Sequence, residues 1–337
     1  MPESAAPYEI VKGLLQGVAA PRPLFLPIVF SHAARIENVP LRTFLRNPTK
    51  ISNALRQVRA RLRSDGVTCY FDPFLESEAL GATLEWAADD RPPLLKWPMP
   101  GAAEGLEISA TAAHIVSGGR VPVAAEVIRR LKTTLRGDSL LMASVTGPLT
   151  LTASLSRLDM QNAPNYPDFA EQALDLVTTA ITAIATTFLE AGASALLIRE
   201  EILPTMSDEN FADWCSRLAP IVNIVRFYRA LPVLLLECRK GVEANRERIL
   251  RAPWDCILCP VVRAHAHATL LAELGPSSFG LALPPEMLGP GSAADFDAWI
   301  RQTVCEVRPA VLTTTGDLPA SVDIERLNKL WENLQCP

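Results

Sequence analysis

Short apolar runs alternate with longer amphipathic segments along the chain, and this rhythm constrains the fold more than any other feature of the sequence. Eight runs have the length and apolar character of buried strands. They are residues 23–30, 67–71, 140–145, 195–198, 232–236, 256–259, 279–283 and 310–312. Most of the connections are long enough for the helical crossovers that parallel strands require. The pattern therefore predicts an α/β fold, a single (β/α)8 TIM barrel spanning residues 1–337.

Two segments lie outside this rhythm. Residues 1–20 precede the first predicted strand and form an N-terminal extension. Residues 85–113, between the second and third strands, are rich in proline, alanine and glycine and are expected to be irregular. Long excursions of this kind often form a lid or wall over a site, so this one is expected to lie over the rim of the barrel. No change of composition divides the chain into two domains.

The composition excludes several classes of protein. The chain has 49% hydrophobic and 20% charged residues, which is typical of a globular protein. Its net charge of −5, without any run of Lys or Arg, argues against a nucleic-acid partner. Its apolar stretches are expected to be shorter than the roughly 18 residues that span a bilayer, and its polar start, MPESAAPYEI, does not resemble a signal peptide. Seven cysteines, an odd number, indicate free thiols, and we therefore expect a cytoplasmic protein without membrane insertion.

In a barrel of this type, the chemistry lies where the strands run into the following loops, at their carboxyl ends. The polar or reactive residues at these exits are therefore the candidates for the site. They are Ser31, His32, Arg35, Asp72, Thr146, Glu200, Glu201, Glu237, Cys238, Cys259 and Asp317. Carboxyl groups gathered at one rim raise the pKa of one another, so one of them can serve as a general acid. Such a group also favours a cationic ligand or a bound metal.

Several ordered segments resemble the uroporphyrinogen decarboxylase (URO-D) superfamily, and they extend over nearly the whole chain. FDPFLESEALGATLEW and PPLLKWP are closest to its cobalamin/coenzyme M methyltransferase branch. GPLTLTASL resembles the Gly-Pro-x-Thr-Leu motif of the family, and LLLECRKG resembles its His-x-Cys-Gly segment on the fifth strand. These and the other similar segments occupy residues 71–86, 92–98, 147–155, 190–201, 234–241, 283–291 and 313–330. The resemblance implies the barrel fold of this superfamily and two alternative chemistries.

One of these chemistries is the cofactor-free decarboxylation of a porphyrinogen or a smaller pyrrole. In that branch, an Arg-Gln-Ala-Gly-Arg motif binds substrate carboxylates, and here SHAAR keeps Arg35 but has Ser31 and His32 in place of the first Arg and the Gln. Asp72 matches the residue that binds pyrrole N–H groups. The loss of one Arg removes a bidentate carboxylate contact, so a tetrapyrrole with many carboxylates would be bound poorly. The residues expected to contact a small-molecule substrate are His32, Arg35, Ser154 and Glu237.

The other chemistry is methyl transfer. In that branch, a His-x-Cys pair on the fifth strand and a later Cys bind zinc, which activates a thiol as the methyl acceptor. Here the pair reads Leu236-x-Cys238, and the late position is Asp317 or a neighbour, so one ligand of three remains. A different zinc site is a further hypothesis, and its ligands would be Cys238, Cys259 and Asp317.

The leading hypothesis is a methyltransferase-like enzyme that moves a methyl group between a small methylated compound or acceptor and a corrinoid. The corrinoid would belong to a partner protein, because the chain has no Asp-x-His-x-x-Gly cobalamin-binding segment, and no covalently bound cofactor is expected. Glu200 rather than Glu201 is expected to point inward, because it holds the family position. The proposed catalytic residues are Asp72, Glu200, Cys238 and Asp317. A porphyrinogen-type decarboxylase and a non-catalytic ligand-binding barrel are the alternatives, and a homodimer is left open.

Overall fold

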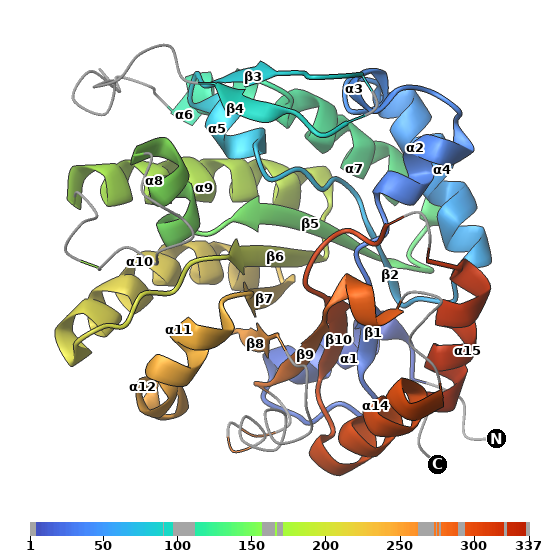
Figure 1. The fold of residues 1–337 in the computed structure, drawn as a ribbon, viewed down its shortest axis with the longest axis vertical. Coiled ribbons are helices and arrows are strands. Elements are labelled where there is room, and N and C mark those ends of the chain that lie inside the picture. The colour runs from blue at the N-terminus through green and yellow to red at the C-terminus, as the bar shows by residue number, and fades with distance from the viewer. Residues whose placement is uncertain are drawn as a thin grey trace.

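The computed structural model describes residues 5–89, 91–96, 112–156, 166, 171–261, 273, 275, 278–288, 294–319 and 322–334. Each of the eight predicted apolar runs contains or overlaps a parallel strand. The strands are β1 (Leu24–Leu26), β2 (Gly66–Thr68), β5 (Leu140–Thr146), β6 (Ala195–Glu200), β7 (Leu231–Leu236), β8 (Ile257–Pro260), β9 (Gly280–Leu283) and β10 (Val311–Thr314). They are arranged round a common interior, with helices outside them (Figure 1).

The order of the strands is that of a (β/α)8 barrel. One sheet runs β2-β5-β6-β7-β8 and a second runs β1-β10-β9. The parallel bridges Leu258–Phe279 and Val261–Ala282 join β8 to β9. Between β1 and β2, the described residues form no ladder. The predicted α/β barrel is therefore confirmed, with one seam between β1 and β2.

Asp65, which directly precedes β2, bridges this seam. Its backbone N–H donates to the Phe25 carbonyl at 2.9 Å, and its Oδ2 accepts the Phe25 N–H at 2.8 Å. The carboxylate also accepts two hydrogen bonds from the Arg22 guanidinium, at 2.7 and 2.8 Å. Arg22 in turn lies over the ring of Trp331, in the last helix α15 (Ile324–Leu334). The first two barrel strands and the last helix thus meet at one charged residue pair.

Alternation along the strands divides the core into two parts. Leu24, Leu197 and the other side chains of their parity fill the barrel interior, whereas the opposite parity packs beneath the helices. The helix α1 (Pro7–Leu15) adds Ile10 and Leu14 to the interior cluster. The segment predicted as an N-terminal extension therefore belongs in part to the barrel core.

The connecting helices lie outside the strands (Figure 1). After β1 come α2 (Ser31–Ile36), α3 (Leu41–Phe44) and α4 (Pro48–Arg61), and between β2 and β5 come α5 (Leu75–Ala79), α6 (Ala112–Ser117) and α7 (Val121–Leu135). After β5 come α8 (Pro148–Ser156) and α9 (Glu171–Ala191), and after β6 comes α10 (Asp208–Phe227). After β7 come α11 (Arg239–Ala244) and α12 (Arg246–Arg251), and after β9 come the 3-10 turn Pro285–Leu288 and α14 (Ala294–Val307).

An antiparallel hairpin begins just before the segment expected to be irregular and extends into it. Strand β3 (Thr83–Glu85) pairs with β4 (Leu94–Lys96), and both strands are largely exposed. The rest of this segment includes residues 90 and 97–111, which lie outside the described residues. Three-residue strands carry too little alternation to be distinguished from a loop in the sequence, so the hairpin was not predicted.

The helix α9 corrects the expectation that every apolar stretch is too short to span a bilayer. Its 21 residues satisfy that requirement by length and composition. Its buried residues include Ile181, Ile184 and Phe188, which belong to the core cluster beneath the helices. These contacts are typical of a core helix in a barrel.

We expect the substitution Asp65→Ala to lower the free energy of unfolding by about 3–5 kcal/mol, because it removes the partner of a largely buried guanidinium. The Arg22 and Asp65 side chains are 18% and 8% exposed. Urea denaturation would measure the change. The control Glu9→Ala breaks an ion pair with Lys12 in which both side chains are 69% exposed, and it should cost less than about 1 kcal/mol. Equal effects of the two substitutions would contradict a role for Asp65 at the seam.

Candidate functional site

A pocket of about 320 Å³ lies at the carboxyl ends of β1, β2 and β10, on the predicted rim. It brings together three of the predicted rim residues, Ser31, Asp72 and Asp317. The rest of its described lining is apolar and consists of three phenylalanines, three leucines and four prolines. Two of the prolines, Pro92 and Pro93, belong to the β3–β4 loop and so form part of the pocket wall.

The carboxylate of Asp317 holds the start of α2 against the end of β10. It accepts the backbone N–H groups of Phe30 and Ser31, each at 2.7 Å, and also the Ser31 hydroxyl. Burial raises the pKa of Asp317, and these hydrogen bonds act in the opposite direction. Asp317 therefore lines the pocket, and both of its carboxylate oxygens already accept hydrogen bonds from other residues of the protein.

Asp72, on the loop after β2, is bound in a similar way. Its Oδ1 accepts the Phe74 N–H at 2.8 Å, and its Oδ2 accepts a hydrogen bond from the Arg120 guanidinium. Arg120 also donates to Glu78 at 2.6 Å, so two carboxylates share one cation. The Asp72 and Arg120 side chains are each only 3% exposed. Burial raises the pKa of Asp72 although Arg120 opposes the change.

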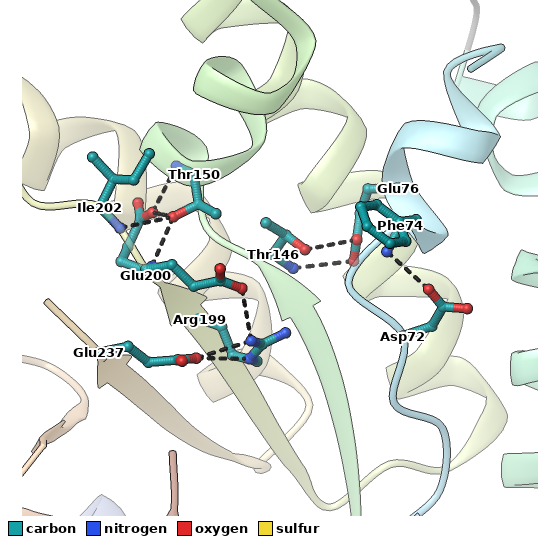
Figure 2. A network of polar contacts seen from close by, with 10 residues as sticks. Asp72, Phe74, Glu76, Thr146, Thr150, Arg199, Glu200, Ile202 and Glu237 are labelled. Carbon is teal, nitrogen blue, oxygen red and sulfur yellow. Dashed lines mark hydrogen bonds and ion pairs between the residues drawn. The ribbon is translucent and has the colours of Figure 1, made fainter. Parts of the chain in front are cut away.

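A second group of charges lies at the same rim, at the ends of β6 and β7 (Figure 2). The Arg199 guanidinium donates to Glu237 Oε1 at 2.9 and 3.0 Å and to Glu201 Oε1 at 2.8 Å. Its Cζ lies 4.5 Å from the centre of the Phe71 ring. Phe71 also lines the pocket, so it connects the two parts of the site.

The sequence prediction included Glu201 and Glu237 among the candidates but missed Arg199. A usable signal was present, because Ala195 and Leu197 face the barrel interior and Arg199 has the same parity. An arginine in an otherwise apolar buried strand therefore had to enter the mouth of the barrel. Arg199 lies within the strand, whereas the predicted candidates lie at or beyond the carboxyl ends of the strands.

Glu237 is the carboxyl group of the rim best suited to proton transfer. Its side chain is 21% exposed, so a ligand can reach it. Burial raises the pKa of Glu237 to about 7, with Glu201 adding to the rise and Arg199 opposing it. A carboxyl group with a pKa near neutrality can both give and accept a proton at physiological pH.

Glu200 does not point inward, and the expectation that it would do so is wrong. Its fully buried carboxylate accepts the backbone N–H groups of Leu149 and Thr150 at 3.0 and 2.9 Å, the Thr150 hydroxyl at 2.7 Å and the Trp214 Nε1–H at 3.3 Å. It therefore binds the start of α8 on the helix side of the sheet. A side chain at Gly147 would put its Cβ 2.4 Å from the Glu200 Cδ, which explains the glycine of the Gly-Pro-x-Thr-Leu segment.

Three further candidates lie outside the described lining of the pocket. His32, in the first turn of α2, is partly buried, and its Nε2 has no hydrogen-bond partner among the described residues. Arg35, near the end of α2, is exposed to solvent. Ser154 is partly buried on α8. Their expected contacts with a substrate stay predictions.

The expected zinc ligands are not brought together. Cys259 is fully buried in the barrel interior, whereas Cys238 packs on the opposite core cluster, beneath the helices. Asp317 already binds the start of α2, and Leu236 is fully buried at the position of the family histidine. No group of three potential metal ligands occurs among the described residues. Of the described cysteines, five are free as expected, whereas Cys305 is disulfide-bonded.

The fold and the rim site define a TIM-barrel protein with an apolar pocket at the carboxyl ends of its strands. The family model of uroporphyrinogen decarboxylase (URO-D) matches residues 12–258, and the chain belongs to this family. Two methylcobamide:CoM methyltransferases MtaA from Methanosarcina barkeri, one of them from strain Fusaro / DSM 804, are 29% and 28% identical to it over 147 residues. This match covers 42% of this chain and 42% of each relative, so it spans less than half of their length.

A solved structure agrees over a longer range. The methyltransferase from Methanosarcina mazei superimposes with a TM-score of 0.78 over 98% of both chains, at 19% sequence identity. Similarity at this level of identity concerns the fold. It confirms that the chain folds as a URO-D-like barrel over nearly its whole length.

The stability of the protein should fall as the pH rises from about 5 to 7. Burial raises the pKa of Glu76 and of Glu200 to about 7 from an ordinary value of 4.5. Between these values the folded state binds more protons than the unfolded state, so the contribution of each group is fully present below pH 4.5 and is lost as the pH rises through 7. Each group changes the free energy of unfolding by about 1.4 kcal/mol per pH unit.

Urea denaturation at several pH values would measure this slope. The substitution Glu200→Gln should make the slope shallower, even though it also removes hydrogen bonds at every pH. The control Glu126→Gln, on the exposed face of α7, should leave the slope unchanged. A stability that is flat or increasing between pH 5 and 7 would show that both carboxyl groups ionise normally.

Proposed function

We propose that this protein is a methyltransferase-like enzyme that moves a methyl group between a small methylated compound and a corrinoid carried by a partner protein. Membership of the URO-D family and the similarity to the MtaA methyltransferases support this class of reaction. The observation that carries the proposal is the position of Glu237, a carboxyl group with a raised pKa, across Arg199 and Phe71 from an apolar pocket. The pocket is suited to the body of a small organic molecule, and the carboxyl group to its leaving atom.

The residues of the chain have distinct parts in this reaction. When the bond between the methyl carbon and its heteroatom breaks, the electron pair stays on the heteroatom. Protonated Glu237 gives its proton to that atom, and Arg199 stabilises the carboxylate that remains. Glu201 shares the guanidinium and helps to hold the pKa of Glu237 near neutrality. A corrinoid on the partner would supply the methyl acceptor or donor.

Zinc has no part in this proposal. The MtaA relatives are named for transfer to coenzyme M, and in the methyltransferase branch that the sequence resembles, zinc activates the thiol. The described residues do not fit zinc, because Leu236 has no ligating atom and Cys238 and Cys259 lie in different parts of the core. We therefore derive no step through this metal.

The substitution Glu237→Gln should lower the rate of methyl transfer about 10²- to 10⁴-fold, because it removes the proton donor and keeps the size of the side chain. The spectral change of free cob(I)alamin mixed with a panel of small methylated compounds would report the transfer. The control Glu247→Gln, at a side chain that is 80% exposed on α12, should leave the rate unchanged.

Uroporphyrinogen should be tested in parallel, because decarboxylation is the other chemistry of the family. If the protein releases carbon dioxide from uroporphyrinogen and gives no methyl transfer, the proposal is wrong. If Glu237→Gln transfers methyl groups at the normal rate, the class of reaction stands but the role of Glu237 does not.

A further inference from the structure

We infer that the pocket at the ends of β1, β2 and β10 binds the alkylated onium group of a small organic cation, such as a quaternary ammonium. This inference deepens the proposed function, on which it rests, by naming the chemical class of the methylated compound. It stands on the shape, the apolar lining and the charge of one cavity.

The lining of the pocket suits alkyl groups rather than polar ones. The rings of Phe30, Phe71 and Phe74 line it together with leucines and prolines, and its volume is about 320 Å³. Aromatic rings attract cations through their negative faces, most strongly where water is excluded. An onium centre surrounded by methyl groups can contact such a surface without losing any hydrogen bond, because it has none to give.

The charged groups of the pocket are both acids. Asp72 and Asp317 line it, and its described lining contains no Lys, Arg or His. The nearest cation bonded to either acid is Arg120, which is shared between Asp72 and Glu78. Arg46 also lies 3.7 Å from Glu78, so Arg120 and Arg46 together balance the charges of Asp72 and Glu78. Asp317 forms no ion pair with a Lys or Arg of the described residues, so its negative charge is not balanced in this way. The pocket therefore has an excess of negative charge that its own residues do not neutralise.

The hydrogen bonds of these acids indicate which kind of cation suits the pocket. Asp317 accepts from the Phe30 and Ser31 backbones and from the Ser31 hydroxyl, and Asp72 accepts from Phe74 and Arg120. Each carboxylate oxygen already has a donor from the chain. Asp317, with three donors for about four acceptor sites, offers a ligand its electric field and little free hydrogen-bonding capacity, which favours an onium group over a primary amine. The negative field of the pocket would repel an anion, and a neutral ligand would gain no charge–charge attraction from it.

Burial raises the pKa of both Asp72 and Asp317, although Arg120 opposes the rise at Asp72. A bound cation would favour their ionised forms. In the proposed reaction, the bond between the methyl carbon and the onium nitrogen breaks, and the electron pair stays on nitrogen. A reduced corrinoid on the partner would accept the methyl group. The released tertiary amine then takes the proton of Glu237.

Isothermal titration calorimetry with three probes of similar shape tests the inference on the full-length protein. Choline carries a quaternary ammonium, 3,3-dimethylbutanol is its uncharged counterpart, and 3,3-dimethylbutanoate is an anion. We expect choline to bind about tenfold more tightly than the alcohol or better, and the anion to bind most weakly. Equal affinity for choline and the alcohol, or tighter binding of the anion, would overturn the inference.

Two substitutions locate the binding. Phe74→Leu keeps an apolar side chain but removes a ring, and Asp72→Asn removes a charge. Each should weaken choline binding at least about threefold and leave the affinity for the alcohol nearly unchanged. Phe227→Leu, at a residue that is 77% exposed on α10, is the matched control and should have no effect. Thermal unfolding of each variant checks that it is folded, and the comparison of probes on the native protein does not depend on any variant.

The two proposals fail in different ways. If choline binds with the expected preference but neither onium compounds nor any other compound of the methylated panel transfers a methyl group to cob(I)alamin, the inference on the pocket stands and the proposed function falls. If neutral methyl ethers are the substrates and choline has no advantage in binding, the proposed function stands and the inference falls.

Discussion

The end of β6 determines where the charged side chains of the rim lie. Three charged residues follow one another there, and the alternation of a strand sends them to different sides. Glu200 turns to the helices and collects four hydrogen bonds from α8 and α10. Arg199 turns to the mouth of the barrel and holds Glu201 and Glu237. The Thr150 hydroxyl donates to Glu200 and also accepts the Glu201 N–H at 2.8 Å. It therefore links the buried Glu200 on the helix side to the backbone of Glu201, whose side chain belongs to the charged group at the rim.

The segments that mark the family are mainly devices that fix the loops. Gly147 leaves room for Glu200, and Thr150 binds it. Asp72 binds the backbone two residues on, and Asp317 joins the last strand to the start of α2. These contacts fix the loops of the barrel and do not themselves depend on a substrate. The position of the family histidine, in contrast, has become Leu236, a core residue. Fold and function are thus recorded in different residues of one sequence.

The barrel could be predicted from the sequence because each buried strand is a short apolar run. All eight predicted runs contain or overlap a strand. It was insufficient for the direction of single side chains at strand ends, where one residue decides between the two faces. Glu200 was assigned to the wrong face for this reason, and Arg199 was missed. The pocket was found in part, since Asp72 and Asp317 could be placed at strand exits. Arg120, the partner of Asp72, is distant from it in sequence and lies before α7, so no local pattern indicated it.

The electrostatics of the rim explain how one site can both bind and react. Each guanidinium there faces two carboxylates, Arg120 those of Asp72 and Glu78, and Arg199 those of Glu201 and Glu237. The Arg199 group keeps one negative charge, whereas Arg46, 3.7 Å from Glu78, balances the Arg120 group, so the negative charge on the pocket side is that of Asp317. Burial makes this excess of negative charge costly, and it can be relieved by a proton or by a bound cation. The exposed side, at Glu237, is suited to the proton, and the enclosed apolar side is suited to an organic cation. The same physical imbalance therefore accounts for the acid and for the selectivity of the pocket beside it.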